Sequence, residues 1–121
     1  MWLDTVEGFV NTNDVLIARV NGNHAEVFPV VAGEYRGYGY PYPLRSLDPV
    51  AAMVKGWCDL GEGAFLNVER FSYIIIRKNG ASGALSATFY LSDSKLPFAD
   101  SFDLSPAHME RLKAFLEART K

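Results

Sequence analysis

The sequence predicts an α+β domain in which two βββα-type units form one antiparallel sheet with both helices on one face. Two observations support this fold. Asn-Gly pairs at residues 21–22 and 79–80 separate segments rich in β-favouring residues, and such pairs favour the tight turns that join antiparallel strands. Helix-start patterns then follow at Pro49 and Pro106. Because 121 residues is the length of one ordinary domain, we expect a single domain over residues 1–121.

The strands are predicted in order along the chain. Residues 1–11 resemble a strand entering a turn, and residues 14–20 are apolar enough for a central strand. Residues 24–31 form the return strand, and Pro29 within them cannot donate to a ladder, so we expect this strand at a sheet edge. Residues 58–63 resemble a connector. Two further strands with a turn between them follow in residues 64–78, and another strand is expected in residues 84–93.

Both helices have a capping residue before a proline. Asp48 is placed to cap a helix that begins at Pro49, and Ser105 is placed to cap one that begins at Pro106. The apolar residues that follow at helical spacing are Val50, Met53, Val54 and Trp57 in the first helix, and Met109, Leu112, Phe115 and Leu116 in the second.

The two halves of the chain look like copies, residues 1–57 and 62–119. "VLIARVNG" in the first matches "YIIIRKNG" in the second, and "LDPVAAMVKGW" matches "LSPAHMERLKAF", at a nearly constant offset. A unit of this size buries little apolar surface alone, so the two units are expected to share one core. The alternative fold is a partly closed barrel with the C-terminal helix plugging it.

Composition excludes some classes of function. The net charge is −2, which argues against a protein whose main role is neutralising nucleic-acid phosphates. The lone Cys58 cannot form an intramolecular disulfide, and no apolar segment has the length of a membrane span. We therefore expect a cytoplasmic protein with no membrane association, no cofactor and no metal.

Candidate catalytic residues are few. His24 and His108 have no second ligand or base nearby, so we expect both to be solvent-exposed, and Cys58 to be a buried structural residue. Asp100 and Asp103 precede the last helix, where acidic residues usually serve capping. A small hydrolase using these carboxylates and His108 is the weakest of the functional hypotheses.

Four of the six tyrosines lie within residues 35–42, in the stretch "EYRGYGYPYP". Prolines at positions 41 and 43 favour an extended chain, which places the alternating tyrosines on one face. The resulting candidate binding site comprises Tyr35, Arg36, Tyr38, Tyr40 and Tyr42.

This segment allows several interpretations. It can cover the domain's own core, or form a protein interface, since tyrosine and arginine are enriched in interface hot spots. It can also stack on a small molecule or on single-stranded nucleic acid. A ladder beside an edge strand is well placed for a twofold homodimer. The leading hypothesis is a non-enzymatic interaction domain that acts as a homodimer or binds a protein partner.

Overall fold

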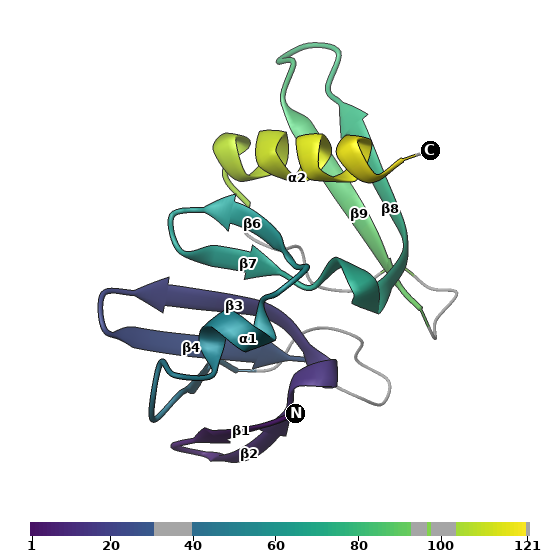
Figure 1. The fold of residues 1–121 in the computed structure, drawn as a ribbon. Coiled ribbons are helices and arrows are strands. Elements are labelled where there is room, and N and C mark those ends of the chain that lie inside the picture. The colour runs from purple at the N-terminus through teal and green to yellow at the C-terminus, as the bar shows by residue number, and fades with distance from the viewer. Residues whose placement is uncertain (31–39, 93–96, 98–103, 121) are drawn as a thin grey trace.

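The computed structural model describes residues 1–30, 40–92, 97 and 104–120, and Figure 1 shows how its strands and helices are arranged. The elements are β1 (Trp2–Thr5), β2 (Gly8–Asn11), η1 (Thr12–Asp14), β3 (Val15–Asn21), β4 (His24–Pro29), β5 (Tyr42–Pro43), α1 (Val50–Met53), β6 (Cys58–Gly61), β7 (Ala64–Leu66), η2 (Val68–Arg70), β8 (Phe71–Lys78), β9 (Leu85–Leu91) and α2 (Pro106–Arg119), where η marks a 3₁₀ turn.

The largest sheet has five antiparallel strands in the order β5-β4-β3-β7-β6. The central position of β3 is as predicted, because its first four residues are all buried. The turn between β3 and β4 contains Gly22 at φ 63, the positive dihedral that its Asn-Gly pair predicts. The α+β class and the antiparallel pairing are therefore confirmed.

The other described strands form two separate hairpins, β1-β2 and β8-β9, rather than extending one continuous sheet. The 3₁₀ turn η1 lies between β2 and β3, and η2 lies between β7 and β8. At each of these turns the chain leaves one sheet and enters another. A single bridge between Thr5 and Leu44 links the first hairpin to the segment after β5. The described strands do not close into a barrel.

The central sheet contributes to two cores. One core contains Leu16 and Leu66 from the sheet, Phe89 from β9 and Leu112 from α2, which lies across the β8-β9 hairpin and beside β6 (Figure 1). The other core packs around Val15 and Val27 of the sheet and includes Leu3 of β1 and Met53 of α1. The two helices thus pack into different cores instead of sharing one face.

The C-terminal helix matches its prediction, and the first helix is shorter than expected. Ser105 caps α2 and Pro106 opens it. In contrast α1 is a single turn capped by Pro49 without a side-chain hydrogen bond, and the backbone N–H of Asp48 instead donates to Ser46 Oγ at 3.1 Å. The helix ends at Met53, and Gly56 at φ 85 lies in the turn that follows it. The prediction of Asp48 as the cap was therefore wrong.

The order of elements recurs between the halves. Two strands, a 3₁₀ turn, two strands and a helix occur first in β1 to α1 and again in β6 to α2, with β5 as an addition in the first series. Residues 58–63, expected to be a connector, contain β6 and the turn after it. An origin by duplication stays a prediction.

Candidate functional site

The tyrosine segment enters the described structure at Tyr40, whereas Tyr35, Arg36 and Tyr38 lie outside the described residues. The Tyr40 side chain is 87% exposed. Tyr42 is half-buried in β5 and packs against the core around Val27. Among the two described tyrosines of this segment, one thus covers the protein's own core and the other is available to a partner.

Strand β5 connects β4 to the N-terminal hairpin. It pairs Tyr42 with Val27 in β4, and the carbonyl of Pro43 accepts a hydrogen bond from the N–H of Val6 at 3.0 Å. The prediction that β4 forms a sheet edge was therefore wrong over the residues that β5 pairs. Pro29 lies at the end of β4, beyond that pairing, where its missing N–H costs no hydrogen bond to β5.

The N-terminal hairpin carries the most prominent apolar surface of the described chain. Leu3 and Val10 point into the core, so the alternating residues Trp2 and Phe9 point outward and are 66% and 76% exposed. Because Trp2 pairs with Asn11 and Phe9 lies two residues before it, the two rings are diagonal neighbours on one face. We define the N-terminal apolar surface as Met1, Trp2, Val6 and Phe9, all exposed on this hairpin.

Sequence reasoning missed this surface. Residues 1–11 were expected to form a strand entering a turn, without an assignment of their side chains to a face. The available signal was the alternation of Trp2 and Asp4 with Leu3 and Thr5. Alternation shows that the faces differ, but which face is buried depends on contacts with residues distant in the sequence.

The histidines and carboxylates do not form a catalytic group in the described part of the chain. His24 is exposed, as predicted. His108 is half-buried, which contradicts its prediction, because it completes a capping box: its Nδ1 accepts from the Ser105 N–H, and its own N–H donates to Ser105 Oγ at 3.1 Å. Asp100 and Asp103 lie outside the described residues.

Cys58 is a buried structural residue, as the sequence predicts. It begins β6 and is fully inaccessible to solvent. Burial, together with the neighbouring Asp59 carboxylate, raises the pKa of the Cys58 thiol to about 11, against a weaker opposing effect of Arg111 and Arg119. The thiol is therefore protonated at neutral pH and is a poor nucleophile.

A polar cleft of about 460 Å³ lies where the two halves of the chain meet. The turns η1 and η2 supply two of its walls, and the segment from α1 to β6 supplies the third. The residues that line it are Thr12, Asn13, Met53, Lys55, Gly56, Trp57, Asn67, Glu69 and Arg70.

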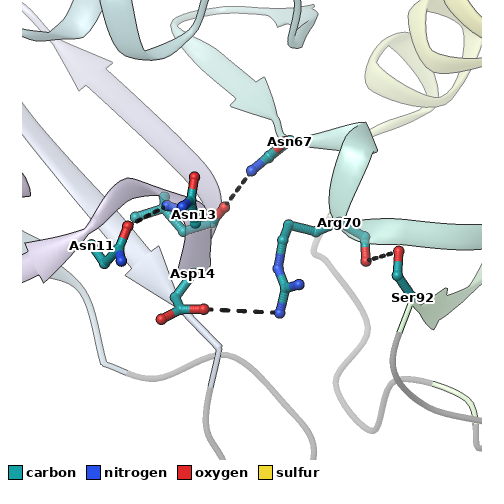
Figure 2. Close-up of polar contacts among 7 residues, drawn as sticks. Asn11, Asn13, Asp14, Asn67, Arg70 and Ser92 are labelled. Carbon is teal, nitrogen blue, oxygen red and sulfur yellow. Dashed lines mark hydrogen bonds and ion pairs between the residues drawn. The ribbon is translucent and has the colours of Figure 1, made fainter. Parts of the chain in front are cut away.

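Figure 2 shows the polar contacts that hold the two turns together. Asn67 is buried and donates its Nδ2 to the Val15 carbonyl at 3.0 Å. Arg70 extends from η2 toward Asp14 of η1, and the closest guanidinium nitrogen lies 4.0 Å from the carboxylate (Figure 2). The cleft therefore has a fixed floor and one basic side chain oriented across it.

In the described residues no group of three or more histidine, cysteine or acidic side chains is arranged to hold a metal ion. Within the same ranges, no helix is both long and apolar enough to cross a bilayer. Comparisons of the chain with protein families, with curated proteins and with solved structures found no match. Any function must therefore be argued from this chain's own surface.

Proposed function

We propose that the protein is a non-enzymatic interaction domain that forms a homodimer through its N-terminal apolar surface. The observation that carries the proposal is the outward exposure of Trp2 and Phe9 on one face of the β1-β2 hairpin. Large aromatic side chains on a protein surface are the residues that most often dominate binding energy. Tyr40 of the predicted tyrosine site is also exposed, and it lies two residues before β5, which is hydrogen-bonded to the same hairpin.

The available area is in the range that an interface core requires. Aromatic side chains bury about 150–250 Å² each, so the two largely exposed aromatic residues of the hairpin supply on the order of 300 Å² per subunit. A stable interface of standard size buries about 800 Å² per partner. Met1 and Val6, each about half exposed, add part of the remainder.

A second copy of the chain is the partner that fits this surface. Strand β2 has no neighbour on its outer edge within the described residues, and two such edges can pair antiparallel about a twofold axis. The acidic residue on the same face, Asp4, is already paired with Arg45 at 3.4 Å. Two copies of the face can therefore meet without placing unpaired Asp4 carboxylates opposite each other.

The test is the mass of the protein in solution, measured by light scattering over a range of concentrations. We expect the wild-type chain to run as a dimer and Phe9→Lys to run as a monomer, since a lysine on an edge blocks pairing. Phe9 is mostly exposed, so the variant should fold. Tyr73→Lys is the matched control, because Tyr73 is a largely exposed aromatic residue on β8, and it should remain dimeric.

Two outcomes would overturn the proposal. One is a wild-type chain that remains monomeric at the highest concentration measured. The other is a Phe9→Lys variant that stays dimeric with an unchanged circular dichroism spectrum, which would place the interface elsewhere on the molecule.

A further inference from the structure

The polar cleft between η1 and η2 has the properties of a ligand site. We infer that it binds a small molecule carrying one oxyanion group, phosphate or carboxylate, with Lys55 and Arg70 contacting the anion and Trp57 contacting the rest of the ligand. This site is formed by different residues from the N-terminal apolar surface, and the inference does not depend on self-association.

Charge supports an anionic ligand. The cleft is lined by two basic residues, Lys55 and Arg70, and one acidic residue, Glu69. The whole chain has a net charge of −2, so the cleft is locally basic on a protein that is acidic overall. A concave surface with an excess of one sign of charge attracts small ions of the other sign.

Arg70 has binding capacity that the described chain does not use. Its side chain is only 24% exposed, and its one ion pair, with Asp14, is 4.0 Å long, beyond hydrogen-bond distance. Its buried Nε has no hydrogen-bond partner. Meanwhile the Arg70 carbonyl accepts two hydrogen bonds from Ser92, which fix the backbone from which the side chain extends (Figure 2).

Partial burial makes this arginine a stronger anion ligand than a surface one. Attraction between charges increases as water is excluded from around them. The planar guanidinium also presents paired donors that match the oxygens of a phosphate or carboxylate. An oxyanion in the cleft would therefore satisfy donors that Asp14 reaches only at long range.

The remaining walls suit the body of a small ligand. Trp57 is half-buried and offers a flat apolar surface, while Thr12 and Asn13 add polar side chains on the opposite turn. The volume of about 460 Å³ lies within the roughly 300–1,000 Å³ that small-molecule sites occupy. A combination of one aromatic wall with two cations favours a ring-bearing anion over an inorganic one.

Titration followed by nuclear magnetic resonance tests this site directly. The chain has two tryptophans, so a ¹⁵N-labelled sample gives two indole signals, and Trp2→Phe assigns the one from Trp57. Phenyl phosphate and benzoate are the probes, with phenol as the uncharged control. We expect both anions to shift the Trp57 signal in a saturable manner and to leave the Trp2 signal unchanged. The probe that binds with the lower dissociation constant identifies whether the cleft prefers phosphate or carboxylate.

Variants then identify the cation. Lys55→Ala should weaken probe binding about tenfold, the size of one lost charge contact in a partly buried site, and binding should weaken as salt is added. Lys78→Ala is the matched control, since Lys78 is an exposed lysine on β8 and does not line the cleft. Its affinity should equal that of the wild type.

Three results would overturn the inference. These are a Trp57 signal that none of the probes moves, a response to phenol as large as that to phenyl phosphate, and an affinity for Lys55→Ala equal to that for Lys78→Ala. None of these readouts depends on whether the protein is a dimer.

Discussion

The two short hairpins β1-β2 and β6-β7 occupy matching places in the two halves of the chain, yet their environments differ. In β6-β7 the side chains of Leu60 and Leu66 are fully buried, and α2 covers the hairpin. In β1-β2 only one face is buried, and Trp2 and Phe9 remain exposed on the other. The two hairpins thus differ in how much of their surface the rest of the protein buries.

Neighbouring strands and the C-terminal helix account for this difference. β7 pairs with β3 on one side and with β6 on the other, whereas β2 pairs with β1 alone in the described residues. The helix adds polar contacts to β6, since Arg111 donates to the Asp59 carbonyl at 3.1 Å and lies 3.8 Å from its carboxylate. No comparable helix lies over β1-β2 among the described residues.

Removing one large apolar side chain from each hairpin should give the largest contrast. Leu66→Ala is expected to cost about 2–5 kcal/mol of unfolding free energy, because it leaves a cavity between the two halves. Phe9→Ala should change the stability of the single subunit by about 0.5 kcal/mol or less, since the ring is solvated in the subunit, so both variants are compared with the wild type at protein concentrations below those at which the wild type dimerises. Urea unfolding followed by circular dichroism measures both, and equal losses would contradict the comparison.

The sequence predicted the elements whose signals are local. We expected the central strand β3, the turn at Gly22, the strands β8 and β9, and the capped helix α2. Their signals are alternation, Asn-Gly turns and Ser-Pro helix starts, which each depend on only a few residues. A strand was also expected at residues 84–93, and in β9 the alternating apolar residues Phe89 and Leu91 are buried.

Features set by distant contacts could not be predicted. The sequence of β6 contains Asp59 and Gly61 and is typical of a loop. It forms a strand because β7 pairs with it and α2 packs against it. Phe9 and Phe65 follow similar Glu-Gly pairs in the sequence, but only Phe65 packs against a core. The cleft was also missed, because Lys55 and Arg70 approach each other only in the folded chain.

Substitution of the turn glycines should give a smaller contrast. Gly63 has φ 79, and a methyl group there would overlap the backbone oxygen of Val20, whose N–H donates to the Gly63 carbonyl at 2.8 Å. Gly63→Ala should therefore cost about 2–3 kcal/mol, from strain plus displacement of β3. Gly8 also has positive φ, but a methyl group there meets no atom within 4 Å, so Gly8→Ala should cost about 1 kcal/mol.

Thermal unfolding of these two glycine variants gives the comparison directly. A Gly8→Ala variant as unstable as Gly63→Ala would indicate that the first hairpin is packed as tightly as the second. That result would also weaken the proposed interface, which needs a hairpin whose outer face is free.

The matched asparagines should give the smallest contrast. Asn67→Ala removes the hydrogen bond from a buried side chain to the Val15 carbonyl and leaves that acceptor without its partner, so it should cost about 1–3 kcal/mol. Asn11 accepts from the Asn13 N–H at 3.0 Å in an exposed cap of η1, and Asn11→Ala should cost about 0.5–1 kcal/mol. Hydrogen exchange sharpens the test: Asn67→Ala should speed exchange of the Asn67 N–H, which donates to the Leu16 carbonyl at 2.9 Å, whereas Asn11→Ala should not. Equal increases in the exchange rate of the Asn67 N–H in both variants would contradict this expectation. The junction of the two halves would then depend on both turns, and the first hairpin would be as tightly coupled to the central sheet as the second.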